Sequence, residues 1–174
     1  MQTRSTYKGQ GWRAMVAGVV LLAGFCNPAW ANMPQPQAAL QVGIATAKPV
    51  ELSPQQLAAL PQHTTVTATP WTDGVAQFSG PLAVDVMKAA GVELAKGMVV
   101  QAEALNGYVI DIPAEDFLRW PVILAFTMDG KPLTRRDKGP LWIIYPRDSD
   151  KVLQDARYDH RWAWQLRQLR IKTQ

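Results

Sequence analysis

The chain has 174 residues, of which 48% are hydrophobic, with 18 Lys and Arg against 14 Asp and Glu. Residues 1–31 hold three of the basic residues and no acidic one, so the rest is nearly neutral and gives no indication of a nucleic-acid partner. Residues 32–174 are enough for one domain with a single core, and their lack of cysteine excludes disulfides and thiolate metal sites there.

The first 31 residues have the layout of a cleavable secretory signal. Three basic side chains precede an apolar run over residues 15–26, and Ala29-Trp30-Ala31 supplies a small-x-small cleavage site. The run is shorter than the roughly 20 residues that cross a bilayer, so we expect cleavage rather than a retained anchor. Cys26 follows the bulky Phe25, which disfavours a lipid-modified cysteine. We therefore expect a periplasmic protein that is not inserted in the membrane after cleavage.

Residues 32–50 are rich in Pro, Gln and Ala with weak periodicity, which predicts a flexible arm before a domain over residues 51–174. Ser53 and Gln56 have capping-box spacing around Pro54, which predicts a short helix that ends near Leu60. The next patterns predict a half-exposed strand over 63–69, a loop over 71–80 and a helix over 81–90. A hairpin of strands 98–104 and 108–112 about Asn106-Gly107 follows, and then a helical turn over 114–119. The last patterns predict a strand over 122–127, a turn at Asp129-Gly130, a strand over 141–145, an irregular or short-helical stretch over 147–161 and a last strand ending near Lys172. Together these elements predict an α+β domain with a mixed β-sheet and short helices.

Catalytic chemistry has little support among the polar residues. His63 and His160 are the only histidines, and neither lies in a nucleophile motif or a metal-binding motif. Asp116 could serve acid–base chemistry, but its place just after Pro113 favours a role at a helix start. The chain also lacks a Gly-rich phosphate-binding loop. We therefore expect no catalytic residue, no metal site and no enzyme activity.

An aromatic loop is the best candidate for a binding site. Trp71 lies between Pro70 and Gly74, and an indole held in such a loop offers a rigid face for stacking on a flat heteroaromatic ligand. The alternative is a core aromatic residue that pins the loop. Residues 135–138 form a basic turn, which is either solvated or the cationic rim of a ligand site.

Four short motifs occur in a characteristic order: Thr69-Pro70-Trp71-Thr72, Phe78-Ser79-Gly80-Pro81-Leu82, Asn106-Gly107-Tyr108 with Ile112-Pro113, and the sequence GPLWIIYP over residues 139–146. The ordered set, which covers roughly residues 50–171, resembles the sulfite-oxidase-like molybdopterin-binding domain and implies that fold. Two departures stand out. Enzymes of this family bind molybdenum through a cysteine in the loop that corresponds to residues 69–79, which has none, and they place a phosphate-binding arginine at the position of Trp142.

The resemblance is to a branch of small exported proteins that act as periplasmic pterin receptors. It implies that the liganded protein engages the periplasmic part of a membrane-bound cyclic-di-GMP synthase/phosphodiesterase and so controls biofilm formation. The expected ligand is a reduced pterin, with no cofactor used as a catalyst. The ligand-binding candidates are Trp71 for stacking, Thr69, Thr72 and Asp73 for polar contacts, Tyr108 and Trp142 for the walls, and Arg136 for the ligand side chain.

Two alternatives stay open. The chain could be a molybdopterin-dependent oxidoreductase, or an accessory subunit of one, that binds the cofactor through contacts other than cysteine. It could also be a structural protein of the cell envelope with no ligand.

Overall fold

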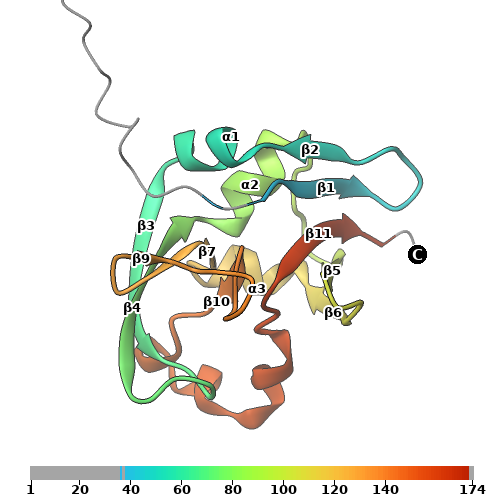
Figure 1. The fold of residues 1–174 in the computed structure, drawn as a ribbon. Coiled ribbons are helices and arrows are strands. Elements are labelled where there is room, and N and C mark those ends of the chain that lie inside the picture. Colours follow the sequence, from blue (N-terminus) through green and yellow to red (C-terminus); the bar gives the residue numbers. More distant parts are fainter. Residues whose placement is uncertain (1–35, 37, 173–174) are drawn as a thin grey trace, which may run out of the picture.

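Short strands and short helices make up the fold of residues 36 and 38–172, which are the residues that the computed structural model describes (Figure 1). The strands are β1 (Leu40–Ile44), β2 (Val50–Leu52), β3 (Gln62–Ala68), β4 (Val75–Pro81), β5 (Val99–Ala104), β6 (Val109–Pro113), β7 (Ile123–Ala125), β8 (Thr127–Met128), β9 (Lys131–Pro132), β10 (Trp142–Ile144) and β11 (Leu166–Ile171). The helices are α1 (Pro54–Ala59), α2 (Ala83–Ala89), α3 (Ala114–Arg119) and the 3₁₀-helices η2 (Arg147–Ser149), η3 (Lys151–Gln154) and η4 (Ala156–Arg161). The predicted α+β class with short helices is confirmed, while the predicted signal sequence lies outside the described residues.

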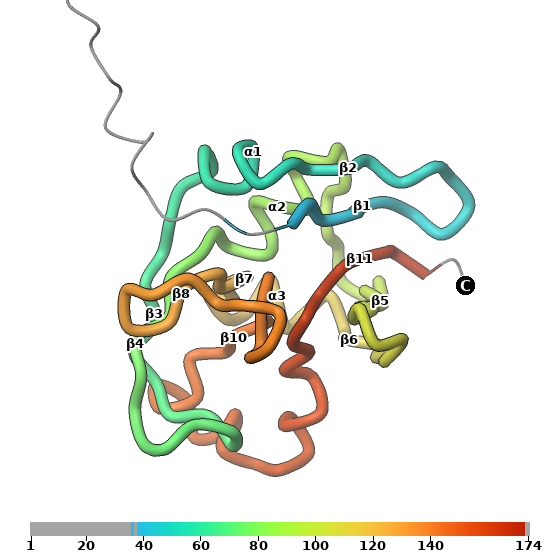
Figure 2. The backbone as a smooth tube through the Cα atoms, viewed as in Figure 1, coloured from blue at the N-terminus to red at the C-terminus, as the bar shows by residue number. Residues whose placement is uncertain are grey.

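The strands form three sheets. The largest has the order β2-β1-β11-β5-β6, a second has the order β3-β4-β8-β9, and β7 pairs with β10 alone. All named pairs are antiparallel except β1 with β11. Figure 2 shows that the connection from β10 to β11, which carries the three 3₁₀-helices, runs beside the tip of the β3–β4 hairpin. A hydrogen bond from the Ala68 N–H to Asp148 Oδ2 (2.7 Å) joins these two segments.

The prediction of a flexible arm over residues 32–50 is wrong for its second half. Residues 40–44 form β1, which lies between β2 and β11 in the largest sheet. Leu40 and Val42 are buried because they alternate on the side of β1 that faces the core. The described part of the domain therefore includes this strand, and it begins well before residue 51.

The predicted loop over residues 71–80 is also wrong for most of its length. Residues 75–81 form β4, which pairs with β3 along its whole length. Ala76, Phe78 and Gly80 alternate inward along this strand. Only residues between Ala68 and Val75 are left to form the loop that carries Trp71.

Local signals in the sequence predict the other elements well. Both hydrogen bonds of the capping box are present, because Gln56 N–H donates to Ser53 Oγ (3.2 Å) and Ser53 N–H donates to Gln56 Oε1 (2.8 Å). Gly107, at φ 82°, turns the chain between β5 and β6. Residues 129 and 130 turn it between β8 and β9 with φ of 50° and 73°. These turns confirm both predicted turn positions.

The hydrophobic core lies between the sheets and reaches the 3₁₀ segment. Its largest fully buried side chains include Phe78, Trp142, Tyr145 and Trp162. No helix in the described part of the chain is long and apolar enough to cross a membrane. In the sequence, Trp142 precedes and Trp162 follows the segment that carries η2, η3 and η4. Both belong to the core, which therefore supports the region that contains the candidate site.

Candidate functional site

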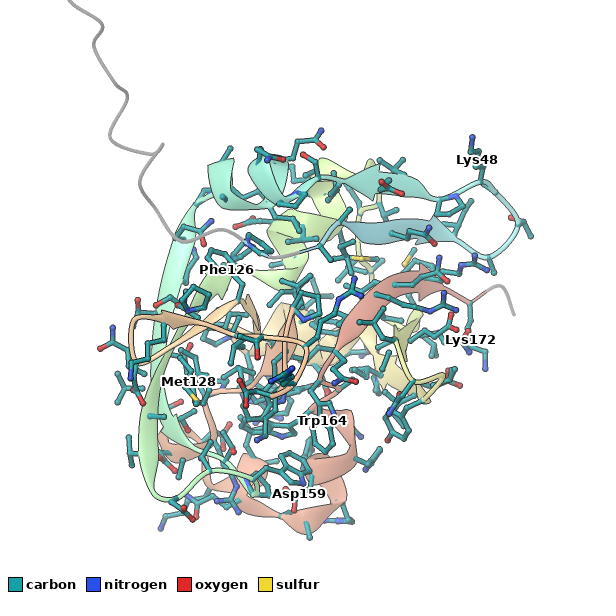
Figure 3. The ribbon with its side chains drawn as sticks, viewed as in Figure 1. Lys48, Phe126, Met128, Asp159, Trp164 and Lys172 are labelled. Carbon is teal, nitrogen blue, oxygen red and sulfur yellow. The ribbon has the colours of Figure 1, made fainter. Side chains whose placement is uncertain are left out.

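A cavity of about 240 Å³ opens between the β5–β6 hairpin, the Trp71 loop and the chain that follows η4. Its lining residues are Trp71, Ala104, Asn106, Tyr108, Asp159, His160, Trp162, Ala163 and Trp164. Asp159 and Trp164 are labelled in Figure 3, near the segment between β10 and β11. Common ligand pockets measure roughly 300–1,000 Å³, so a cavity of this size suits a single small ring system.

Four indole rings meet at one side of the cavity. The ring of Trp71 lies 5.1 Å from that of Trp164, 6.3 Å from that of Trp162 and 6.5 Å from that of Trp142, measured between ring centroids, with interplanar angles of 60–76°. Such tilted and edge-to-face arrangements are the favoured geometry of aromatic pairs. They hold the Trp71 side chain against the core and present an apolar wall to a ligand.

The opposite wall is held in place by buried polar contacts. Arg161, the last residue of η4, donates from Nη1 to Asp116 Oδ2 of α3 at 2.6 Å. The hydroxyl of Tyr145 donates to the same carboxylate oxygen at 2.9 Å. Burial raises the pKa of Tyr145 well above its ordinary value, and the negative charge of Asp116 adds to the shift. The η4 segment is therefore fixed to α3 and the core by a contact of its last residue.

A further contact joins two of the segments that line the cavity. Tyr108, directly before β6 in the turn of the β5–β6 hairpin, donates from its hydroxyl to the backbone carbonyl of His160 at 3.0 Å. This hydrogen bond connects the hairpin to η4, and both residues line the cavity. The two halves of the site thus come from segments about 50 residues apart in sequence, since the contact spans 52 positions.

Two polar atoms of the cavity-lining residues are shielded from solvent without a partner. Among the described residues, neither Asp159 Oδ1 nor the indole Nε1 of Trp162 has a hydrogen-bond partner. A buried polar group without a partner costs roughly 1–3 kcal/mol, and both atoms lie behind the surface of the cavity wall. The lining also contains no lysine and no arginine.

Of the seven residues that the sequence singled out, the structure brings Trp71 and Tyr108 to the cavity. Thr69 and Thr72 instead build the loop. The Trp71 N–H donates to Thr69 Oγ1 (3.1 Å), the Thr69 N–H donates to Thr72 Oγ1 (3.1 Å), and the Thr72 hydroxyl donates to the Gly74 carbonyl (3.1 Å). These bonds fix the position of Trp71, so both threonines have a structural role next to the cavity.

The other three predicted residues lie outside the lining. Asp73 and Arg136 are exposed on their loops. Trp142 is fully buried, and its Nε1 donates to the Trp162 carbonyl at 3.1 Å. The indole of Trp142 therefore packs behind Trp71 in the core, where it supports the wall instead of forming it.

Sequence reasoning missed Asp159 and the indoles of Trp162 and Trp164. Asp159 lies in a charged stretch that favoured a solvated segment, and the alternation of the two tryptophans favoured a core strand. Trp162 is buried, whereas Trp164 is only partly buried and faces the cavity. Two aromatic residues at alternate positions directly after a charged turn were the available signal.

The described residues do not fit a complete molybdopterin cofactor. They include no cysteine, and no three His, Cys, Asp or Glu side chains come together as a metal site within them. The cavity also lacks the cations that hold a phosphate group. A pterin ring without metal or phosphate requires neither a metal ligand nor a phosphate-binding cation, because it is uncharged at neutral pH. Its flat shape matches the indole side chains that line the cavity.

Two known proteins are similar to this chain in sequence or in fold. YuiH of Bacillus subtilis (strain 168), named an uncharacterized oxidoreductase, is 30% identical over 111 residues, which are 62% of this chain and 56% of that protein. The sulfane dehydrogenase SoxCD from Paracoccus pantotrophus has a similar fold, with a TM-score of 0.61 and 20% identity over 80% of this chain and 39% of that one. The chain thus spans about half the length of these proteins or less.

A family model described as the oxidoreductase molybdopterin binding domain matches residues 30–149, which is more than half of the chain. The cavity residues 159–164 follow the matched region, so one wall of the site lies beyond the part that the family model describes. The chain belongs to the oxidoreductase molybdopterin-binding domain family.

Proposed function

We propose that this protein is an exported binding protein that holds a reduced pterin in the cavity beside Trp71, without molybdenum redox chemistry. The observation that carries the proposal is the composition of the cavity wall. It combines three indoles and a tyrosine with one carboxylate, and it contains neither cysteine nor a basic lysine or arginine. Family membership supports a pterin-type ligand, and the wall supports a ring that carries no phosphate.

The aromatic wall suits a flat bicyclic ring for two reasons. Trp71 is held in its rotamer by contacts with three other indoles, so it loses little conformational freedom when a ligand stacks against it. The cavity is also lined by no lysine or arginine, so the phosphate of molybdopterin would find no cationic partner there. Both features favour a free pterin over the complete cofactor.

Titration of the purified protein with tetrahydropterin, followed by tryptophan fluorescence and by calorimetry, tests the proposal. We expect quenching of the indole emission, loss of binding in Trp71→Ala, and binding within about tenfold of the wild type in Trp71→Phe, which keeps an aromatic face. Trp71→Phe is the matched control, because it replaces the indole by a phenyl ring and so keeps an aromatic face at this position. Absence of binding at millimolar ligand, equivalent to about 4 kcal/mol, would contradict the proposal.

An oxidoreductase that uses the complete cofactor is the second candidate, because both compared proteins are named for redox activities. This candidate requires a metal ligand other than cysteine, and the described residues offer no cluster for it. Elemental analysis of the protein purified from the cell envelope decides between the two. Stoichiometric molybdenum would favour the oxidoreductase, and its absence together with bound pterin would favour the receptor.

We further propose that the liganded protein acts in the periplasm on the periplasmic domain of a membrane-bound cyclic-di-GMP synthase/phosphodiesterase. The signal-like first 31 residues and the family resemblance of the sequence support this role. Leu105, Tyr108 and Val109 are exposed on the hairpin beside the cavity, where a partner could sense the ligand. Such sensing requires a higher affinity for the partner in the liganded state. Calorimetry with the isolated periplasmic domain, with and without tetrahydropterin, measures that difference, and equal affinities would refute it.

A further inference from the structure

We infer that the free edge of β3 is a self-association surface, at which a second copy of this chain adds its own β3 in antiparallel orientation. β3 runs down the left side of the molecule in Figure 1 and is an outermost strand in the sheet order β3-β4-β8-β9. In the dimer, the two four-stranded sheets form one continuous sheet across a twofold axis. The inference goes beyond the proposed function, and it does not depend on which ligand the cavity beside Trp71 binds.

The first step is the direction of the backbone groups of β3. Val66 lies opposite Gln77 of β4, in a pairing that runs along the whole strand without a register shift. Both backbone groups of Gln77 are used on the other side of β4, because its N–H donates to Asp129 Oδ1 (2.9 Å) and its carbonyl accepts from the Asp129 N–H (2.8 Å). Hydrogen-bonded pairs alternate along an antiparallel ladder. The backbone N–H and C=O groups of Val66, and of Thr64 two positions earlier, therefore point to the free edge.

The second step is the length of edge that stays open. The Ala68 N–H points outward by the same alternation, and it donates to Asp148 Oδ2 of η2 at 2.7 Å. The 3₁₀-helix η2 therefore covers the last residue of β3. No backbone hydrogen bond outside the sheet uses Thr64 or Val66 in the described part of the chain. Placing Thr64 of one copy opposite Val66 of the other uses both residues in both copies and forms about four hydrogen bonds.

The third step is that β3 is the edge that can meet its own copy without repulsion. Edge strands in natural sheets are commonly protected from pairing by charged residues and prolines. The sequence of β3 contains no proline and no Lys, Arg, Asp or Glu. A twofold axis brings the two copies of an edge together, so a charge on that edge meets a like charge. The other exposed edge strands of the described residues each contain a charge and contain or adjoin a proline: Glu51 and Pro49 at β2, Asp111 and Pro113 in β6, and Lys131 and Pro132 in β9.

The exposed face beside this edge is apolar. Val66 of β3 and Val75 of β4 are each 61% exposed, which is the highest value among the large hydrophobic side chains of the described residues. Val75 lies opposite Ala68, so the two valines are diagonal neighbours on one face of the hairpin. A second copy continues this face and brings its own Val66 close to the first. Because the paired strands run antiparallel, the Trp71 loops of the two copies lie at opposite ends of the joined strands.

Sedimentation velocity of the purified protein between about 10 µM and about 1 mM tests the inference. We expect a reversible dimer with a dissociation constant above about 1 µM, because one strand pair is a smaller contact than a standard interface. Val66→Lys places a cation on the edge of both copies and should weaken association by at least about tenfold. Val75→Lys makes the same change at an equally exposed valine one strand away from the edge. It is the matched control and should associate as the wild type does.

Hydrogen exchange followed by NMR locates the contact. We expect the amide protons of Thr64 and Val66 to exchange at least about tenfold more slowly at concentrations where dimers form than in dilute solution. The Thr65 amide points to β4 and should be protected at both concentrations. This measurement on the wild type also decides the question if a lysine variant does not fold, which near-ultraviolet circular dichroism would show.

The outcomes that overturn the inference are distinct. A protein that stays monomeric up to about 1 mM overturns it, and so does a dimer that Val66→Lys leaves unchanged. Slow exchange of the Thr64 and Val66 amides at every concentration would show that another segment of the same chain covers the edge. Equal weakening by Val66→Lys and Val75→Lys would show that the copies meet through the face of the hairpin and not through its edge.

Discussion

Arg161 Nη1 lies 2.6 Å from Asp116 Oδ2, and this ion pair joins the cavity wall to the core. The two side chains are 19% and 7% exposed, so the pair is largely removed from water. Asp116 also accepts the hydroxyl of Tyr145, which satisfies one carboxylate oxygen from two sides. Arg161 is the last residue of η4, which also contains Asp159 and His160. The ion pair of Arg161 with Asp116 therefore helps to fix the position of these two residues.

Removal of Asp116 tests this dependence. Asp116→Ala leaves the Arg161 guanidinium and the Tyr145 hydroxyl buried without their partner, and breaking such a pair typically costs about 3–5 kcal/mol. We expect the free energy of unfolding, measured by urea denaturation, to fall by about 3 kcal/mol. Arg157→Ala is the matched control in the same helix. Its ion pair with Asp155 is exposed, so stability should stay within error. Equal effects of the two substitutions would show that the Asp116 pair is not a buried anchor.

The buried hydroxyl of Tyr145 predicts a loss of stability at high pH. Burial raises the pKa of Tyr145 above its ordinary value of about 10, so the folded protein keeps this proton while the unfolded chain releases it. The contribution of Tyr145 to stability is therefore complete below pH 10 and falls as pH rises from there toward the folded pKa, by about 1.4 kcal/mol per pH unit.

Tyr145→Phe isolates that contribution, because lysines and the other tyrosines titrate in both proteins. We expect the free energy of unfolding of the variant to fall less steeply between about pH 10 and pH 11 than that of the wild type. Urea titrations at matched ionic strength provide the two slopes. Parallel curves would mean that Tyr145 ionises as readily in the folded state as in the unfolded chain.

Trp142 occupies the position where the resemblance places a phosphate-binding arginine, and the structure shows why an arginine does not fit there. The indole of Trp142 is fully buried, and its ring centroid lies 5.3 Å from the ring centroid of Phe78. Lys138 Nζ lies 5.2 Å from the same Trp142 centroid. Trp142→Arg would bury a second cation near Lys138 without a carboxylate partner. We expect a loss of more than about 3 kcal/mol in the free energy of unfolding, against about 1–3 kcal/mol for Trp142→Phe. A stable Trp142→Arg protein that binds phosphate would contradict this assignment.

Local elements of the fold could be predicted from the sequence because their signals are local. The capping box at Ser53 and the hairpin turn at Gly107 each depend on residues within a few positions of one another. The pairing of β1 with β11 could not be predicted in the same way, since Gln41 and Gln168 are hydrogen-bonded across 127 positions. A short strand that follows a Pro- and Gln-rich stretch has the composition of an arm until its distant partner is known.

The residues of the candidate site differ in the same way, because some have a local sequence signal and others do not. Trp71 could be singled out because a tryptophan between proline and glycine is unusual in itself. Asp159 could not, because a charged stretch has the same appearance in solvent as beside a cavity. Its place beside the cavity follows from long-range contacts of its neighbours, since the His160 carbonyl accepts from Tyr108 and Arg161 donates to Asp116 of α3.

Gly80 lies where β4 passes over β7, and this crossing leaves no space for a side chain. A Cβ atom at Gly80 would overlap the Leu124 carbonyl group and the Ala125 Cα atom. Because these are backbone atoms of β7, which cannot move aside as a flexible side chain does, we expect Gly80→Ala to lower the free energy of unfolding by about 3 kcal/mol or more. Gly74→Asn is the contrast, since Gly74 has open space at φ +75° and asparagine tolerates that conformation. Urea denaturation should show a change of about 1 kcal/mol or less for it, and the reverse order would refute the crowding at Gly80.

Tyr108 connects the two halves of the cavity, so its hydroxyl should affect binding more than stability. The residue is 43% exposed, and its hydroxyl makes one hydrogen bond, to the His160 carbonyl. Tyr108→Phe keeps the ring on the wall and removes only that bond, which should cost about 1 kcal/mol or less in the free energy of unfolding. Without it, η4 and the β5–β6 hairpin lose one contact that holds them together, and part of the binding energy goes into ordering these two segments around the ligand. We expect the affinity for tetrahydropterin, measured by calorimetry, to fall by about two- to fivefold. Val109→Thr, a similar change in size at the next exposed position of the hairpin, should leave that affinity unchanged. An unaltered affinity in Tyr108→Phe would mean that the two segments keep their places without this hydrogen bond, and that the Arg161–Asp116 pair alone positions the wall.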